Sequence, residues 1–198
     1  MTLATPLDKL GAVNIMLAGA SETGVNTLAD DGINDTDVAQ QVLNHEILKV
    51  FAKGWDFNSV TKTLSPDSSG NIVVTVNYLR IDGENRDYGR RLTVRSNLLF
   101  DLDNDTNVFD SDVDVCVTQN LEFEDAPLHI RYFIAHRAAR IYQMKANGDL
   151  EADAILQKEE SDAWEEAKKN DSKTRDVTWN SISRDPQASI TLNRRTPY

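Results

Sequence analysis

The sequence predicts an α+β fold in which two helical hairpins form a bundle, a small antiparallel β-sheet is inserted between them, and an extended C-terminal tail follows. Apolar residues recur at helical spacing near both ends of the chain, and β-branched residues cluster in short runs between them. The periodicity fades after residue 170. We therefore expect a helical bundle from residues 1–60 and 124–170, an inserted β domain from 61–123, and a tail from 171–198.

The first predicted hairpin consists of two helices whose starts are marked by polar residues. The first helix opens with a hydroxyl cap, a proline at the first helical position and an early carboxylate: Thr5, Pro6 and Asp8. Its apolar spacing continues to about Ala18. The second helix is expected to begin at Asn34, because the carboxylates of Asp35 and Asp37 favour the positive end of a helix dipole. Gly54 stands where a C-terminal stop is expected.

The middle of the chain has the short β-branched runs of antiparallel strands. Residues 72–81 form one such run, and the turn signal Asp82-Gly83 predicts that residues 90–95 return as its partner strand. Residues 98–102 and 113–118 are expected to form a second pair across a polar connection. Together these runs predict a sheet of about four strands.

The second hairpin and the tail complete the expected fold. Asp125 is expected to cap the third helix, with Pro127 at its first position, and Asp149 to start the fourth helix after Gly148. The tail keeps a number of apolar residues: Val177, Trp179, Ile182, Ile190, Leu192 and Tyr198. Disordered tails rarely keep so many apolar residues. We therefore expect the tail to lie as a strap on a neighbouring molecule. The alternative is that it lies on the domain of its own chain.

Composition limits the functions that the chain can have. The 198 residues include 21 basic and 32 acidic side chains, a formal net charge of −11, which argues against binding nucleic acid through its phosphates. Residues 96–130 hold nine acidic residues and no Lys or Arg, whereas residues 171–198 hold five basic and three acidic ones. The acidic stretch predicts a solvated face or a surface for a basic partner. We expect a soluble protein made inside the cell and not inserted in a membrane.

One stretch has the alternating oxygen ligands of a calcium loop: Asp101, Asp103, Asp105 and Asn107. Thr106 occupies the sixth position, where such a loop needs glycine for its sharp turn, and Asp112 stands where a bidentate glutamate is usual. We therefore expect a polar hairpin turn and no metal site, with a calcium-stabilised binding module as an alternative.

A catalytic site is not expected. The chain has no nucleotide-binding, zinc-protease or serine-hydrolase motif. Its single cysteine, Cys116, alternates with valines in a predicted strand, which favours a packed side chain over a nucleophile. Paired carboxylates are abundant, but only 7% of the residues are aromatic, which disfavours the aromatic-lined cleft of a polysaccharide hydrolase. We expect no enzyme and no cofactor.

Five motifs, in the same order along the chain, resemble the tail tubular protein A family of short-tailed bacteriophages: Val13-Asn14-x-x-Leu17-Ala18, Gly54-Trp55-Asp56-Phe57-Asn58, Leu98-x-Phe100-Asp101, Phe123-Glu124-Asp125-Ala126-Pro127 and Glu159-Glu160-x-x-Ala163. Residue 100 is Phe where that family often has Tyr. The resemblance extends over about residues 8–170, and the C-terminal tail matches least.

The resemblance implies a structural protein of the virion tail in podoviruses. In that family a ring of about twelve copies forms a head-to-tail adaptor between the portal protein and the tail nozzle, tail tubular protein B. Double-stranded DNA is ejected through the ring, and tail fibres attach near its junction with the nozzle. A polysaccharide or cell-wall hydrolase associated with the phage tail is the alternative.

Two sets of residues are candidates for function. The candidates for contact with a neighbouring subunit or the portal are three arginines of the third helix and four residues of the tail: Arg131, Arg137, Arg140, Trp179, Ile182, Arg194 and Arg195. The arginines are expected to meet a neighbour's acidic face or to pair within the monomer. The structural motif residues are expected to anchor the joint between helices and sheet: Gly54, Trp55, Phe57, Asn58 and Pro127.

Overall fold

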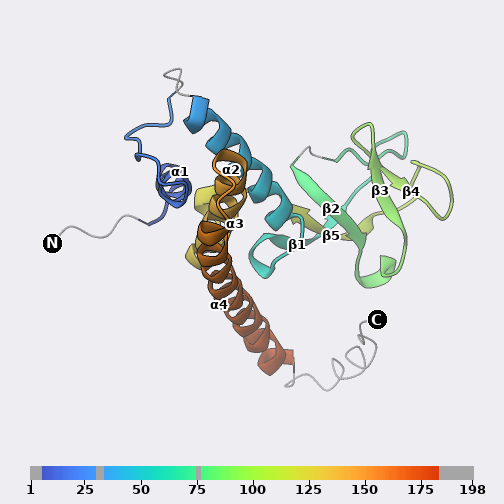
Figure 1. Cartoon of the computed structure of the whole chain (residues 1–198). Coiled ribbons are helices and arrows are strands. Elements are labelled where there is room, and N and C mark those ends of the chain that lie inside the picture. Colours follow the sequence, from blue (N-terminus) through green and yellow to red (C-terminus); the bar gives the residue numbers. More distant parts are fainter. Residues whose placement is uncertain (1–5, 30–33, 75–76, 183–198) are drawn as a thin grey trace.

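The computed structural model describes residues 6–29, 34–74 and 77–182, in which a helical part and a β part lie side by side (Figure 1). The helices are α1 (Lys9–Gly19), α2 (Asn34–Phe51), α3 (Leu128–Ala146) and α4 (Leu150–Ile182). α3 lies at the centre of the helical part, because it packs against α1, α2 and α4. The α+β class with strands inserted between two helix pairs is confirmed.

Two helices begin where the sequence predicts. α2 begins at Asn34 and has two carboxylates in its first turn. α4 follows Asp149, whose Oδ1 accepts hydrogen bonds from the amides of Glu151, at 2.8 Å, and Ala152, at 3.3 Å. The carboxylate thus satisfies amides that have no partner inside the helix.

The other two helices begin later than predicted. The carboxylate of Asp8 accepts the amide of Gly11 at 2.7 Å, so Asp8 rather than Thr5 is the cap of α1. Thr5 lies outside the described residues. Pro127 occupies the cap position of α3 in an extended conformation, with ψ 145°, and Asp125, the predicted cap, belongs to a short 3₁₀ turn. A proline with extended ψ cannot lie inside the helix, so α3 starts after it.

Among the described residues, the β part contains five strands in two antiparallel sheets: β1 (Ser59–Leu64), β2 (Tyr78–Gly83), β3 (Leu92–Arg95), β4 (Leu98–Asp101) and β5 (Val113–Gln119). β5 is the central strand of the larger sheet, whose order is β1-β5-β2, and β3 and β4 form a separate hairpin. Val117 lies opposite Val60 on one side and Ile81 on the other. The antiparallel strands are confirmed, but both predicted strand pairings are wrong.

The turn at Ser96 and Asn97 explains the wrong pairing. Both residues have positive φ, 50° and 63°, as the two central residues of a type I′ hairpin turn require. This turn pairs β3 with β4 in direct succession. Asp82 and Gly83, the predicted turn, are the last residues of β2. β1 was not predicted, because its residues are mostly polar.

Each part of the chain has its own hydrophobic cluster. The helical cluster is formed mainly by buried side chains of α1, α2 and α3, with Leu156 and Ala167 of α4. The β cluster is formed by nine buried residues: Ile72, Val74, Ile81, Leu92, Leu99, Phe109, Val113, Val115 and Val117. The two clusters are separate, so the connection between the parts depends on the residues at their boundary.

α4 is longer than predicted, because it continues through residues 171–182, where an extended tail was expected. This segment contains neither Gly nor Pro. Once a helix is nucleated, each added residue gains a hydrogen bond, so a segment with weak apolar periodicity can continue it. Residues 183–198 lie outside the described part of the chain. None of the helices within the described ranges is long and apolar enough to cross a bilayer.

Gly83→Ala is expected to destabilise the fold, because a Cβ at this position would overlap the backbone carbonyl oxygen of Asp87. We expect a loss of about 2–3 kcal/mol in the free energy of unfolding, measured by urea denaturation. Gly19→Ala is the control, since its Cβ would lie 3.4 Å from Leu156 in ordinary contact. A Gly83→Ala variant as stable as the control would contradict the placement of β2.

Candidate functional site

The Gly54–Asn58 motif connects the end of α2 to the start of β1. Gly54 has φ +75°, in the left-handed region that favours glycine, and its amide donates to the carbonyl of Phe51 at 3.1 Å. A Cβ on Gly54 would lie 3.2 Å from Oγ1 of Thr118 in β5. The glycine therefore ends the helix and lets the chain pass close to the central strand of the sheet.

The side chain of Asn58 links three segments of the chain and is fully buried. Its Nδ2 donates to the carbonyl of Phe51 at the end of α2, at 3.0 Å, and to the carbonyl of Gln119 at the end of β5, at 2.9 Å. Its Oδ1 accepts the amide of Trp55 at 2.9 Å. Each of these backbone groups is near the boundary of the two parts, so one amide side chain joins the helical part to the sheet.

Aromatic side chains surround this junction. Trp55 is 5% exposed, and its Nε1 donates to the carbonyl of Val50 at 2.8 Å. Its ring meets Trp164 of α4 edge to face at 5.6 Å, and Trp164 lies 4.9 Å from Phe133 of α3. The motif therefore contacts α4 as well as α2, and the aromatic cluster keeps water away from the hydrogen bonds of Asn58.

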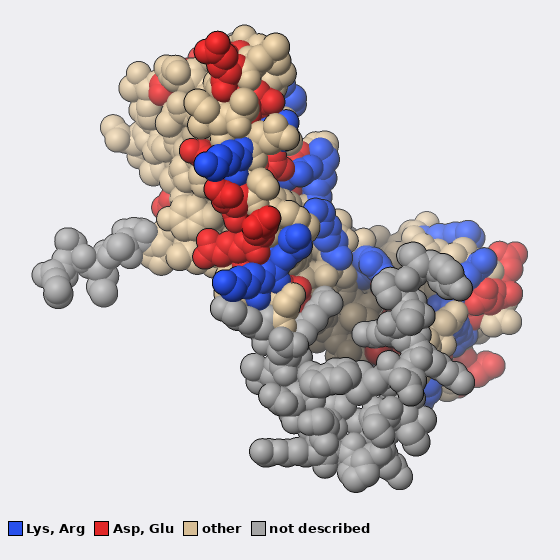
Figure 2. Space-filling view, turned by 60° about the horizontal axis from the view of Figure 1, so that its bottom comes forward, with Lys and Arg blue, Asp and Glu red and all other residues tan. Residues whose placement is uncertain are grey.

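A chain of ion pairs joins α2, α3 and α4. Arg137 of α3 binds Glu46 of α2 at 2.7 Å and Glu160 of α4 at 3.0 Å. Arg140 binds the same Glu160 at 3.2 Å and Asp153 at 2.8 Å. Figure 2 shows Lys and Arg alternating with Asp and Glu over this part of the molecule. The network holds the three helices together at polar positions that the hydrophobic cluster does not cover.

The network shifts the pKa values of Glu46 and Arg140. Burial alone would raise the pKa of Glu46, but hydrogen bonds from Lys49 and Arg137 outweigh burial and lower it. The hydrogen bonds from Arg140 to Asp153 and Glu160 raise the pKa of Arg140. Glu46 and Arg140 are therefore both charged near neutral pH.

The predicted interface arginines already bind groups of their own chain. Arg137 and Arg140 belong to the network, and Nη1 of Arg131 donates to the carbonyl of Leu7 at 2.8 Å. Contact with a neighbour's acidic face would use the donors that these bonds leave over, because a guanidinium has five N–H groups. The other interface candidates were Trp179, Ile182, Arg194 and Arg195. The first two lie on α4, where the structure does not describe their side chains, and the last two lie outside the described residues.

The carboxylate of Asp101 is the centre of the acidic turn, and it is fully buried. The guanidinium of Arg90 binds it at 2.7 Å, Nδ2 of Asn104 donates to it at 2.8 Å, and the amide of Asp103 donates at 2.8 Å. Asp105 lies in the exposed part of the turn with φ 51°. The predicted polar turn is confirmed. In a calcium loop the carboxylate of Asp101 would bind the metal ion, but here it binds the guanidinium of Arg90. No cluster of three His, Cys, Asp or Glu arranged for a metal occurs among the described residues.

The hydrogen bonds of Asp101 also set its pKa. Burial alone would raise this pKa, but the hydrogen bonds from Asn104 and Arg90 outweigh burial and lower it to about 2. Asp101 is therefore ionised near neutral pH.

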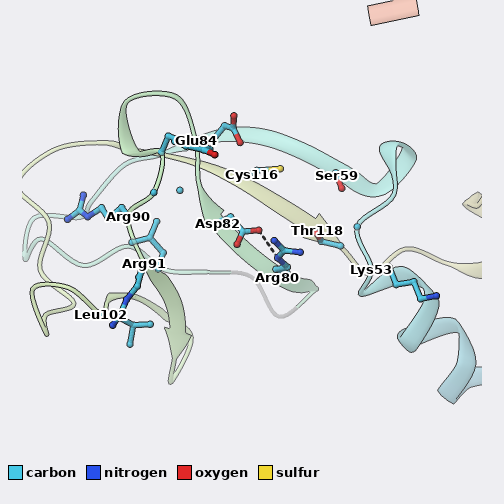
Figure 3. Close-up of a pocket in the computed structure, with 15 residues that line it drawn as sticks. Lys53, Ser59, Arg80, Asp82, Glu84, Arg90, Arg91, Leu102, Cys116 and Thr118 are labelled. Atoms are coloured by element: carbon cyan, nitrogen blue, oxygen red, sulfur yellow. Dashed lines mark ion pairs between the residues drawn. The ribbon is translucent and has the colours of Figure 1, made fainter. Parts of the chain in front are cut away.

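An open groove of about 910 Å³ lies between the end of α2 and the two sheets (Figure 3). Arg80 and Asp82 of β2 form an ion pair inside it at 2.7 Å, and Cys116 and Thr118 of β5 line its floor. Lys53, at the end of α2, points away from this ion pair. Of the described residues that line the groove, none is a histidine. The groove thus places no imidazole base beside Cys116.

The partners of the arginines were missed by the sequence analysis. Glu46 is 2% exposed and lies among buried apolar positions of α2, between Leu43 and Ile47. A glutamate on an apolar helix face is a signal that predicts a buried partner of opposite charge. The partner itself, Arg137, is 91 residues away in the sequence, and spacing along the chain does not identify it.

Asn58→Ala is expected to weaken the junction strongly, because it leaves three buried backbone groups without their hydrogen-bond partner. We expect a loss of about 2–4 kcal/mol in the free energy of unfolding, measured by urea denaturation. Asn44→Ala, on the exposed face of α2, is the matched control and should change stability by less than about 0.5 kcal/mol. Equal stability of the two variants would contradict the role of Asn58.

Asp101→Asn is expected to lower stability by about 2 kcal/mol at pH 6, because Arg90 loses a charged acceptor. The folded pKa of Asp101 lies below its unfolded value, so its ionised form stabilises the fold above about pH 4, and the contribution is lost as the pH falls towards 2. The difference in the free energy of unfolding between the parent and Asp101→Asn, measured by urea denaturation, should therefore narrow between pH 4 and pH 2. Asp105→Asn, in the exposed part of the turn, should match the parent throughout. If the difference in the free energy of unfolding between the parent and Asp101→Asn stays constant with pH, the ionised carboxylate of Asp101 does not stabilise the fold as described.

Comparison with known proteins identifies the family. The sequence profile of the tail tubular protein family matches residues 10–177, which include α1 except its first residue, α2, α3, the five described strands and most of α4. The chain is 28% identical over 144 residues to tail tubular protein A of Klebsiella phage KP34, in an alignment that covers 71% of this chain and 75% of that protein. Residues 10–177, which match the family profile, contain the Gly54–Asn58 junction and the ion pairs of α2, α3 and α4. The chain therefore belongs to the tail tubular protein family, the structural proteins of phage tails.

Proposed function

We propose that this phage tail protein is the head-to-tail adaptor of a podovirus, a ring of about twelve copies between the portal protein and the tail nozzle. The observation that carries the proposal is the family match across the helices, the strands and the junction between them. A ring of identical copies uses two different surfaces of each subunit. The helical part and the β part, joined at Gly54–Asn58, provide two such surfaces in one body (Figure 1).

The charge of the chain supports passage of DNA without retention. Residues 96–130 hold nine acidic residues and no Lys or Arg, and the net charge is −11. Each Lys or Arg that contacts a phosphate strengthens binding to DNA, whereas carboxylates repel the phosphates. In this proposal the exposed carboxylates of the stretch face the lumen, so that double-stranded DNA slides through the ring during ejection into the host.

The proposed assembly has three protein partners. The portal protein contacts one side of the ring, the nozzle protein, tail tubular protein B, contacts the other, and the tail fibres attach near the junction with the nozzle. In this proposal the chain is made in the host cytoplasm and acts in the virion tail without catalysing a reaction. The groove gives the polysaccharide-hydrolase alternative little support, because one of its two carboxylates, Asp82, is paired with Arg80, which leaves Glu84 as the other.

Negative-stain electron microscopy of the purified chain, alone and mixed with the portal ring encoded by the same genome, tests the proposal. We expect a second ring stacked on the portal in the mixture. A portal that stays bare in the presence of excess chain would refute the adaptor role, and a sugar-release assay on host cell wall and capsule would then test the hydrolase alternative.

A chain truncated after Ile182 is expected to fold but to assemble poorly. The truncation keeps α4 and the hydrogen bond from the amide of Asp56 to Asp171, at 2.9 Å. Circular dichroism and thermal melting should therefore match those of the parent. The yield of portal-bound rings should fall at least about tenfold if the tail contacts a neighbour or the portal. Unchanged ring yield would contradict a role of the tail in assembly.

A further inference from the structure

β1 forms one edge of the three-stranded sheet, and β5 is the only strand that pairs with it in the described part of the chain. An edge strand presents a row of unpaired N–H and C=O groups to any extended segment that reaches it. Val60 is 38% exposed, and Thr61 and Thr63 are exposed as well. Three of the six residues of β1 are β-branched, which favours pairing with a further strand.

The edge of β1 lacks the usual protection against pairing. Natural proteins protect such edges with charges, prolines or bulges. The one charged residue of β1 is Lys62, and its Nζ donates to the hydroxyl of Tyr78 at 2.9 Å, 5.1 Å from the centre of that ring. Tyr78 belongs to β2, on the far side of β5. The charge therefore lies over the sheet face, directed away from the open edge.

The C-terminal segment has a sequence that suits this edge. Residues 188–193 read Ala-Ser-Ile-Thr-Leu-Asn, in which Ile190 and Leu192 alternate with polar residues. This alternation is typical of a half-buried strand. A strand of this kind can add its backbone hydrogen bonds to an open edge while its apolar side chains cover one face.

The course of α4 favours a strand from a neighbouring copy over one from the same chain. The hydrogen bond between Asp56 and Asp171 holds α4 beside the start of β1. The eleven helical residues from there to Ile182 advance the chain by about 16 Å, and Figure 1 shows this end of α4 extending beyond the other described elements. Residues 183–187 span at most about 20 Å when fully extended. A return to the same β1 would therefore use nearly all of this reach.

We propose that residues 188–193 of one copy add as a strand to the open edge of β1 of the neighbouring copy. The edge and the segment are two different surfaces of the chain, as a head-to-tail ring requires. The inference rests on the proposed ring, and it names the contact that links successive subunits. The contact is made mainly by the backbone, so its strength depends on the extended conformation and on hydrogen bonds more than on particular side chains.

Disulfide trapping tests which chain supplies the strand. β1 pairs antiparallel with β5, and antiparallel addition of residues 188–193 in full register sets Thr191 opposite Thr61. Thr61→Cys with Thr191→Cys, in a Cys116→Ser background, therefore brings the two thiols together. Adjacent strands place facing Cα atoms about 4.5–5.5 Å apart, within the range of a disulfide. Oxidised portal-bound rings should give a ladder of dimers and higher oligomers on a non-reducing gel. Monomers with an internal disulfide, or no disulfide at all, would overturn the proposal.

Matched variants separate this inference from the adaptor role. Ser111→Cys with Thr191→Cys, in the same background, places the first thiol in the exposed connection between β4 and β5, and it should give no ladder. Thr191→Pro should reduce the ring yield about tenfold by removing a donor and disturbing the strand, whereas Thr196→Pro, outside the segment, should leave it unchanged. If the parent forms no ring, the adaptor role fails together with this inference. If the parent and both proline variants form rings equally, the strand proposal alone fails.

Discussion

The buried side chain of Asn58 holds the helical part and the β part together, and the rest of the structure depends on it. Its amide binds the carbonyls that end α2 and β5 and accepts the amide of Trp55. The buried members of the two hydrophobic clusters are separate, although Leu79 of β2 packs against the helical cluster, so hydrogen bonds at the boundary contribute to how the parts are oriented. In the proposed ring every copy needs the same orientation, because small differences between subunits would accumulate around the circle. A fully satisfied buried amide specifies one orientation, since any other leaves polar groups unpaired.

The ion pairs of Arg137 and Arg140 have a related role within the helical part. These ion pairs are only partly buried, and such pairs add little net stability, because solvent screening and desolvation of the charges offset much of their attraction. Their geometry is restrictive, however, since Glu160 is shared by both arginines. The network therefore acts mainly to fix how α2, α3 and α4 are aligned. That alignment also positions Trp164 against Trp55, so the ion pairs and the junction support each other through the same aromatic contact.

The sequence predicts the features that depend on local patterns. Helical spacing, the starts of α2 and α4 and the stop at Gly54 follow from residues close together in the chain. The predicted strand pairs were wrong, because pairing depends on the positive φ of Ser96 and Asn97 and on contacts between distant segments. β1 was missed, since an edge strand needs no continuous apolar pattern. The arginines of α3 were recognised as important, but their partners on other helices are not visible in the sequence.

Native-state hydrogen exchange across a urea series is the measurement that tests most directly whether the junction joins the two parts into one body. The account predicts that amides in the second half of α2 and in β5 open with the same free energy, equal to that of global unfolding. Exchange of the β5 amides through a separate opening of lower free energy, while α2 and α3 stay protected, would contradict it. In that case the helical part and the sheet would be independent units, and Asn58 would not fix their orientation.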